Sequence, residues 1–455
     1  MSDQSRFLEG SFAPVAEEIT AFDLPVTGRV PAELAGRYVR NGPNPMGLED
    51  PGYHWFVGAG MVHGVRLRDG RAEWYRNRWV RSRTVAEALG DRWAAGPVHN
   101  GFDFPANTHI IAHAGRTLAT VEAGPLPYEL SDELDTLGPC DFSGTLPGGF
   151  AAHTKLDPRT GELHAIAYFF AWEHVQHVVV DAAGRVSRST DIPVAGRPMM
   201  HDFALTGKYV VLYDLPVTFS MDAAAAGRRI PYTWNEAHQA RVGLLPRDGG
   251  SGVRWLGVEP CWVFHTLNSY DDGGRVVLDV CRYPRAYDVS TLGGHGPVTL
   301  DRWTIDPDAS QVKAERLDDR GQEFPRVDAR VVSRPHRYGY SAVIGEVTQA
   351  TAPYSGNFAD DAFANALLKH DLARGTVEAH EFGRDATAGE AVFAPAAPSA
   401  AEDDGYVMAY VHNPGRGAAD LVILHAQDFT GEPVACVHLP ARIPLGFHGS
   451  WIADD

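Results

Sequence analysis

The sequence predicts an all-β protein, and its length points to a β-propeller. Short runs rich in Val, Ile, Leu, Tyr and Phe recur along the chain, each bounded by turn residues. The 47 glycines and 31 prolines are spread through the 455 residues, as a fold with many tight turns requires. Blades of roughly 40–65 residues would divide this length into about seven. We therefore expect a propeller with capping loops and a few short helices.

Seven apolar runs along the chain are expected to form strands. In chain order they are 116–124, 164–172, 208–217, 275–283, 338–345, 406–413 and 420–429. Two further stretches, 65–80 and 177–192, each contain two strand-like halves around a turn, and Asp69-Gly70 in the first is a favoured two-residue hairpin turn. Short helices are expected at 131–137 and 362–370.

The chain is predicted to form one domain over residues 1–455. No linker, low-complexity tract or block of like charges divides it, and residues 1–20 are expected to form an irregular N-terminal arm. The N-terminus shows no charged segment followed by an apolar one, so we expect no signal peptide. No apolar run approaches the roughly 18 residues that span a bilayer.

Charge and cysteine content narrow the class of partner. With 58 acidic and 40 basic residues the formal net charge is −18, which argues against nucleic acid as a partner because phosphate binding needs a basic surface. The four cysteines show no CxxC spacing and are too dilute for a disulfide framework. We therefore expect a cytoplasmic protein.

Four histidines stand in distinctive local contexts. They are His153 in AAHTK, His201 in MMHDF, His265 in VFHTLNSYDD and His448 in GFHGSW. Neutral imidazole is a strong ligand for iron, zinc and copper. The four positions are too far apart for one helix or hairpin, so only a fold that gathers distant segments around an axis could bring them together. From the residues alone, hydrogen-bonded core histidines remain the alternative.

Several segments together resemble one family, the carotenoid cleavage oxygenases. The matching segments are GRYVRNGPNP (36–45), HWFVGAGMVHGV (54–65), NTHIIAHAGRTLATVEAG (107–124), AAHTKLDPRTGEL (151–163), PMMHDFALT (198–206), VFHTLNSYDDG (263–273), GQEFPRVD (321–328) and IPLGFHGSW (443–451). The resemblance implies a seven-bladed propeller with non-haem Fe(II) on its axis. Thr154 stands where the family usually has proline after the first ligand.

The resemblance also implies the site residues. Carried over by position, the iron ligands through which catalysis would occur are His153, His201, His265 and His448. The carboxylates expected to hold these imidazoles are Glu122, Glu323 and Glu390. Such carboxylates fix the tautomer and orientation of a metal-bound imidazole. Taken alone, each glutamate could equally be a surface carboxylate.

The implied reaction is cleavage of a carbon–carbon double bond by O2 into two carbonyl products. The stilbene-cleaving branch typically has lysine before the first glutamate and a tyrosine upstream, whereas this chain has Val121 and no tyrosine in 82–96. An apolar wall suits a polyene, because an unpaired buried phenol is costly. We therefore expect a carotenoid or apocarotenoid substrate. The alternatives are a stilbene or phenylpropenoid, alkene isomerisation, and a non-catalytic propeller that binds apolar ligands.

Two segments are expected to border the substrate, and a third, which overlaps the second, is expected to contact a membrane. The aromatic-rich stretches 168–172 and 219–234 are candidate cavity walls, with ordinary core packing as the alternative. Residues 216–232 carry Val217, Phe219, Met221 and Ile230 beside Arg228 and Arg229. That composition suits a peripheral membrane contact, and a plain surface loop is the other interpretation.

Overall fold

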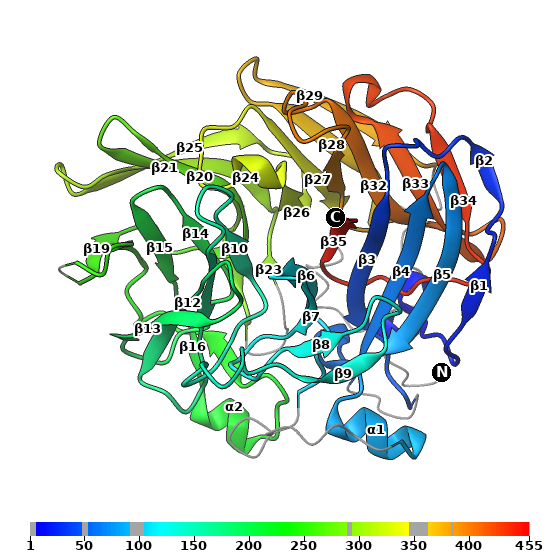
Figure 1. The fold of residues 1–455 in the computed structure, drawn as a ribbon. Helices are drawn as coiled ribbons and strands as arrows, with labels where there is room; N and C mark the ends of the chain where they lie inside the picture. The colour runs from blue at the N-terminus through cyan, green and yellow to red at the C-terminus, as the bar shows by residue number, and fades with distance from the viewer. Residues whose placement is uncertain are drawn as a thin grey trace.

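The computed structural model shows seven antiparallel sheets arranged as blades around a central axis (Figure 1). It describes residues 6–47, 53–91, 104–250, 252–288, 294–344, 363–383 and 386–454. The predicted seven-bladed β-propeller is therefore confirmed.

The first four blades follow one another along the chain, and their strands are given from the inner edge outward. The first blade contains β35 (Gly449–Ala453), β3 (Gly36–Pro43), β4 (Gly60–Arg68), β5 (Arg71–Trp79) and β1 (Thr20–Phe22). The second contains β6 (His109–His113), β7 (Arg116–Thr120), β8 (Tyr128–Leu130) and β9 (Thr136–Pro139). The third contains β10 (Thr154–Leu156), β11 (Leu163–Ala167), β12 (His174–Val180) and β13 (Val186–Pro193). The fourth contains β14 (Phe203–Leu205), β15 (Tyr209–Asp214), β18 (Arg241–Pro246) and β19 (Arg254–Gly257).

The remaining blades complete the ring. The fifth contains β20 (Trp262–Asp272), β21 (Arg275–Tyr283), β24 (Thr299–Asp306) and β25 (Gln311–Asp318). The sixth contains β26 (Gln322–Arg326), β27 (Tyr338–Ile344), β28 (Phe363–Asp371) and β29 (Thr376–Glu381). The seventh contains β30 (Thr387–Ala388), β31 (Val392–Pro395), β32 (Gly405–Asn413), β33 (Ala418–His425), β34 (Ala435–His438) and β2 (Val26–Gly28). Two ribbons lie outside the blades, β16 (Val217–Phe219) with β17 (Tyr232–Trp234) and β22 (Arg285–Ala286) with β23 (Gly294–His295).

The two ends of the chain close the ring. The C-terminal strand β35 pairs with β3, placing Trp451 opposite Tyr38, and the N-terminal strand β2 pairs with β34, placing Val26 opposite Val437. Each terminal strand therefore completes a blade built mainly from the other end of the sequence, and these pairings hold the ring closed. In Figure 1 this closure appears as red β35 beside blue β3.

The predicted hairpins are present, and the predicted helices are not. Asp69 and Gly70 both have positive φ (50° and 72°), as a two-residue hairpin turn between β4 and β5 requires. The prediction of a helix at 362–370 is wrong, because residues 363–370 lie in β28. This strand is central in its blade, between β27 and β29, and every side chain from 366 to 371 is buried. Its Ala and Leu residues, without a β-branched residue among them, favour a helix by composition alone. The helix expected at 131–137 is also wrong: a turn there leads into β9.

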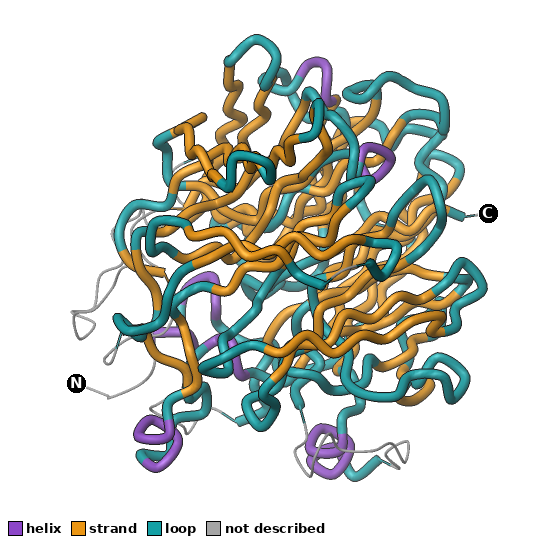
Figure 2. Tube along the Cα trace, turned by 90° about the vertical axis from the view of Figure 1, so that its left-hand side faces the viewer, coloured by secondary structure: helices purple, strands orange, loops and turns teal. Residues whose placement is uncertain are grey.

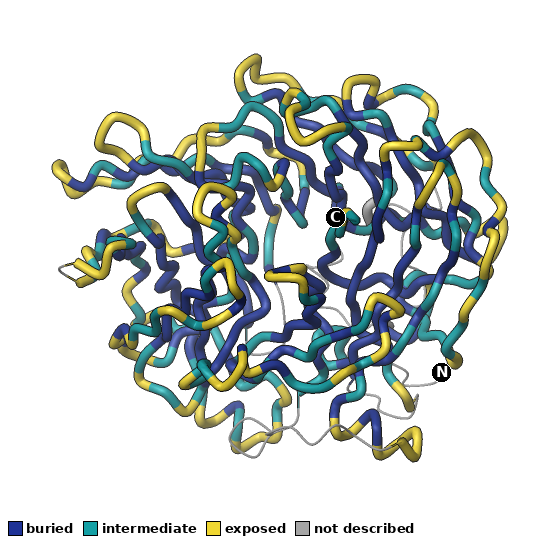
Figure 3. Tube along the Cα trace, viewed as in Figure 1, coloured by how far each residue is buried: buried dark blue, intermediate teal, exposed yellow. Residues whose placement is uncertain are grey.

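Helices are scarce in the part of the chain that the structure describes. The two α-helices, α1 (Arg83–Leu89) and α2 (Met221–Ala225), lie along the lower edge of the molecule in both Figure 1 and Figure 2. Neither is long and apolar enough to cross a bilayer. Figure 3 shows that the strands around the axis are buried while the loops at the rim are exposed, so the core lies between the blades.

Candidate active site

Four blades each place a histidine at the inner edge of the propeller. His153 immediately precedes β10, His201 lies just before β14, His265 lies within β20, and His448 immediately precedes β35. The inner strands of these blades line the same axis. The propeller therefore brings together four histidines that lie far apart in the sequence.

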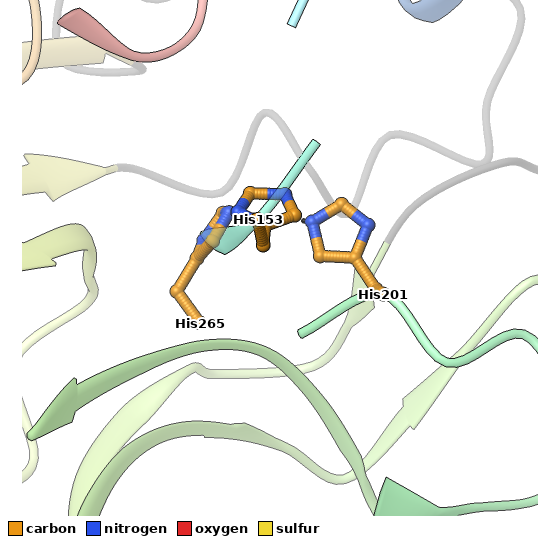
Figure 4. A group of neighbouring side chains, drawn as sticks. All are labelled: His153, His201 and His265. Carbon is orange, nitrogen blue, oxygen red and sulfur yellow. Dashed lines mark hydrogen bonds between the residues drawn. The ribbon is translucent and has the colours of Figure 1, made fainter. Parts of the chain in front are cut away.

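The four imidazoles meet on the axis. His153, His201 and His265 each offer a nitrogen within 4.8 Å of the other two, and their rings face one another in Figure 4. The ring centre of His448 lies 4.7 Å from that of His265 and 4.8 Å from that of His153. All four residues proposed from the sequence are thus brought together.

Three carboxylates determine which nitrogen of each imidazole carries the proton. His265 Nδ1–H donates to Glu323 Oε2 (2.5 Å). His448 Nδ1–H donates to Glu390 Oε1 (2.8 Å). The third carboxylate, Glu122, contacts Nδ1 of His201 through Oε1. A carboxylate accepts hydrogen bonds, so Nδ1 is the protonated nitrogen and Nε2 of each neutral ring keeps a lone pair.

The lone pairs converge on a space that suits a cation. Nε2 of His201 and Nε2 of His265 are 3.3 Å apart, although neither carries a proton in this tautomer. Nε2 of His153 is buried and has no hydrogen-bond partner among the described residues. Neutral nitrogen donors facing one another repel unless a cation lies between them, so this donor set fits a transition-metal ion.

The electrostatics at His153 and Glu122 agree with a neutral ligand beside a charged carboxylate. Burial, with a smaller contribution from His201, lowers the pKa of His153 to about 3. Burial alone would raise the pKa of Glu122, but His201 and His153 lower it overall. The imidazole of His153 is therefore a free base near neutral pH while the Glu122 carboxylate is charged.

Each carboxylate has a second contact that the sequence did not indicate. Glu122 Oε2 accepts a hydrogen bond from the Tyr168 hydroxyl (2.5 Å), Glu323 Oε2 accepts from the Phe324 amide (2.7 Å), and Glu390 Oε2 accepts from the Gly449 amide (2.8 Å). No local motif marks Tyr168 as a partner of Glu122, because the two come from different blades. These contacts fix the orientation of the three carboxylates, which in turn orient the histidine rings.

A cavity of about 690 Å³ opens from the histidine cluster. Its inner end is bordered by His201, His265 and His448. Its walls are mainly aromatic and include Phe56, Phe170, Phe219, Phe264, Phe324 and Phe447. A volume and lining of this kind suit an apolar ligand.

The residues expected to border the substrate do line this cavity. Val121 is 7% exposed and lies next to Glu122 in the wall. The segment 168–172 contributes Phe170, whose ring stacks on Phe219 at 5.4 Å. Of the upstream segment 82–96, residues 92–96 lie outside the described residues.

Two further histidines of the second blade lie off the cluster. His109 Nε2–H donates to the Gly449 carbonyl (3.3 Å), and its ring lies 5.3 Å from that of His448. His113 Nε2–H donates to the carbonyl of Asp181 (2.7 Å). These contacts tie both histidines to backbone carbonyls outside the cluster.

Sequence comparisons identify the family. The family model described as retinal pigment epithelial membrane protein matches residues 12–453. The chain is 47% identical to a carotenoid cleavage oxygenase of Mycobacterium tuberculosis, over 98% of this chain and 97% of the relative. It is 33% identical to an isoeugenol monooxygenase of Pseudomonas nitroreducens, over 98% and 97% of the two chains.

Solved structures give the same result. The lignostilbene dioxygenase of Pseudomonas brassicacearum superposes with a TM-score of 0.87 at 27% identity, covering 99% of each chain. The cobalt-substituted apocarotenoid oxygenase of Synechocystis superposes with a TM-score of 0.84 at 29% identity, covering 97% of each. Together with the match over residues 12–453, these similarities show that the chain is an oxygenase of the carotenoid cleavage oxygenase family.

Proposed function

We propose that this protein is an Fe(II)-dependent dioxygenase that cleaves a carbon–carbon double bond of a carotenoid or apocarotenoid with O2, giving two carbonyl products. The observation that carries the proposal is the convergence of imidazole nitrogens, 3.3 Å apart between His201 and His265, at the inner end of an aromatic cavity. Fe(II) held by these nitrogens would supply the activation of O2.

The residues around the iron site have distinct roles in this proposal. His153, His201, His265 and His448 hold the ion as neutral ligands. Glu122, Glu323 and Glu390 fix the tautomers of three of these rings, each through Nδ1, so that every Nε2 lone pair stays directed at the ion. His153 is the ligand without a close carboxylate of its own, since its Nε2 lies 3.6 Å from Glu122 Oε1.

In this proposal the cavity positions the substrate and keeps water away from the site. Aromatic walls exclude water and contact a conjugated chain along its length, which would hold a double bond beside the site. Val121 keeps the wall next to Glu122 apolar. This lining supports a polyene, and the 47% identical relative from Mycobacterium tuberculosis carries a carotenoid cleavage name.

A stilbene or phenylpropenoid is the second candidate substrate. Its support is the similarity to an isoeugenol monooxygenase and to a lignostilbene dioxygenase over nearly the whole chain. Both candidates share the same double-bond chemistry and differ in the end groups that the cavity must accept.

Product analysis tests the proposal. Anaerobically purified, Fe(II)-loaded protein is given O2 with an apocarotenal in one reaction and a hydroxystilbene in another, and products are identified by liquid chromatography and mass spectrometry. We expect two carbonyl products from the apocarotenal, and none from a His265→Ala variant. The matched control is His113→Asn, outside the cluster. Cleavage of the stilbene alone would contradict the polyene substrate, and cleavage of neither would contradict the proposed activity.

We further propose that residues 1–455 act as one cytoplasmic domain that touches a membrane peripherally to take up its apolar substrate. The segment 216–232 supports this contact: Met221 is 68% exposed, and Arg228 and Arg229 line the cavity beside it. Val217 does not contribute to the surface, because it is fully buried in β16. The apolar surface here is therefore smaller than the sequence predicts.

A further inference from the structure

Two tyrosine hydroxyls in the aromatic cavity have no partner among the residues that the structure describes. Tyr232 is 5% exposed and Tyr287 is 2% exposed, and both line the cavity. The hydroxyl of the neighbouring Tyr168, in contrast, donates to Glu122. When an apolar ligand fills the cavity, a hydroxyl left there without a hydrogen bond costs about 1–3 kcal/mol, so Tyr232 and Tyr287 favour a ligand that brings an acceptor.

Both tyrosines belong to the inner part of the cavity. The ring of Tyr232 lies 6.1 Å from that of Tyr168. The backbone of β17, which carries Tyr232, is bonded to residue 287 through the Trp234 amide and the Tyr287 carbonyl (2.8 Å). The two side chains therefore come from directly connected segments.

The histidine cluster is one aromatic ring away from this pair. The ring of Phe264 lies 6.1 Å from that of Tyr287 and 5.0 Å from that of His201. A group held by Tyr287 thus sits close to the reacting part of a bound alkene, with Phe264 beside it.

The tyrosines act as hydrogen-bond donors. Burial, followed by the negative charge of Glu122, raises the pKa of Tyr287 well above its ordinary value, and the same two causes raise the pKa of Tyr232. An un-ionised phenol offers its proton to an acceptor. The group that satisfies it is an oxygen atom with a lone pair, such as a carbonyl or hydroxyl oxygen.

We propose that Tyr232 and Tyr287 form a hydrogen-bonding subsite for an oxygen atom carried by the conjugated substrate. The subsite rests on the proposed function and narrows it: the enzyme prefers a polyene that bears oxygen, such as an apocarotenoid, to a hydrocarbon polyene. Aromatic rings surround the pair, with Phe219 6.1 Å from Tyr232. A long apolar chain could slide between such walls, and a polar contact fixes which double bond lies beside the histidines.

The test compares two polyenes that differ in one group, an apocarotenal and the hydrocarbon in which methyl replaces the aldehyde. We expect the unaltered enzyme to favour the aldehyde in kcat/KM. Tyr232→Phe and Tyr287→Phe each keep the ring and remove one hydroxyl, and each should lower the aldehyde-to-hydrocarbon ratio about three- to tenfold. The matched control is Tyr75→Phe, which removes a buried hydroxyl bonded to His63 outside the cavity and should leave the ratio unchanged.

Equilibrium binding separates this inference from the activity. Under anaerobic conditions, quenching of tryptophan fluorescence by the aldehyde measures its Kd without turnover, and both variants should raise that Kd by a similar factor. An unchanged ratio and an unchanged Kd in both variants would overturn the subsite. If the unaltered enzyme binds the aldehyde through these hydroxyls but cleaves neither polyene, the proposed reaction fails while the subsite stands.

Discussion

The Tyr168 hydroxyl donates a 2.5 Å hydrogen bond to Glu122 Oε2, and this bond links the cavity wall to a carboxylate that supports the histidine cluster. The other oxygen of Glu122 contacts His201. Tyr168 is therefore a positioning residue for Glu122, acting on the metal site through the carboxylate and His201.

Removing this hydroxyl should weaken metal retention. A hydrogen bond to a charged group contributes about 1.5–3 kcal/mol, so Tyr168→Phe should lower metal affinity about tenfold, measured by competition with a coloured chelator. The matched control is Tyr232→Phe, which lacks a hydrogen bond to Glu122 and should retain the metal. Equal metal affinity in the two variants would show that Tyr168 does not position Glu122.

The glutamates Glu390 and Glu323 differ in how many of their oxygens are used. Glu390 accepts from His448 at one oxygen and from the Gly449 amide at the other, so both oxygens face donors. Glu323 accepts from His265 at Oε2, while its Oε1 has no hydrogen-bond partner among the described residues. The hydroxyl of Tyr283 lies beside Glu323 and can accept as well as donate.

Glutamine should therefore be tolerated at one position and not at the other. In Glu390→Gln the new NH2 group must face either His448 Nδ1–H or the Gly449 amide, and both of these are donors. We therefore expect a loss of metal affinity of about 10- to 100-fold, the range for residues that support a metal ligand. Glu323→Gln can keep its oxygen toward His265 and should lose less than about tenfold. Metal titration of the two variants side by side measures the difference, and the reverse order would contradict this account of the carboxylates.

The fold class could be predicted because many strands carry a local signal. Apolar β-branched runs between turn residues marked the strands, and Asp69-Gly70 marked a hairpin. The segment 362–370 was mistaken for a helix because AFANALLKH is rich in Ala and Leu, which favour helices, and contains no β-branched residue. Composition therefore identified the buried central strands that are rich in Val, Ile and Tyr, and missed β28, which is rich in Ala and Leu.

The site likewise contains residues that the sequence could predict and contacts that it could not. The histidines and glutamates stand in recognisable segments, so a family resemblance could nominate them by position. The hydrogen bond from Tyr168 to Glu122 and the place of Tyr287 in the cavity wall could not be predicted, since each depends on which distant segments the closed ring places side by side. Burial of Val217 depends likewise on the pairing of β16 with β17.

A buried histidine pair outside the active site predicts acid sensitivity. Burial, then His177, lowers the pKa of His164 to about 2, and burial, then Arg188, lowers the pKa of His177 to about 3. His164 Nε2 accepts from the guanidinium of Arg247 (3.1 Å), and His164 Nδ1–H donates to His177 Nε2 (3.0 Å). This arrangement requires both rings to be neutral.

The lowered pKa values of His164 and His177 make the free energy of unfolding depend on pH. In the unfolded chain histidine titrates near pH 6.5, so below that pH the unfolded state binds protons that the folded state does not. The free energy of unfolding should fall as the pH decreases from about 6.5 toward 3, by about 1 kcal/mol per pH unit for each histidine. Urea unfolding at pH 7, 6 and 5 measures the slope. His177→Gln should reduce the slope of the free energy of unfolding against pH by the contribution of one histidine. An unchanged slope would contradict the prediction.

The proposed membrane contact depends on Met221. This side chain is 68% exposed at the start of α2. Met221→Glu should weaken co-sedimentation with phosphatidylcholine–phosphatidylglycerol vesicles about tenfold or more, because burying a methionine contributes about 1.5–3 kcal/mol. The matched control is Phe22→Glu, which alters a 62% exposed side chain on β1 at the outer edge of the first blade. Equal losses for both variants would indicate adsorption without a defined contact.

Val121 provides the sharpest test of substrate choice. Its side chain lies in the cavity wall next to Glu122, where an apolar surface favours a polyene. Val121→Lys places an ammonium group in this wall, which must lose its hydration wherever an apolar chain covers it. The same ammonium attracts a phenol oxygen. We therefore expect kcat/KM for an apocarotenal to fall at least about tenfold while kcat/KM for a hydroxystilbene rises.

Val121→Met separates the effect of charge from that of size. Methionine is longer than valine but remains apolar and adaptable, so this variant should keep the preference for the polyene even if both rates change. A shift of preference in the methionine variant equal to that in the lysine variant would mean that cavity shape, and not the polarity of the wall beside Glu122, determines which alkene is cleaved.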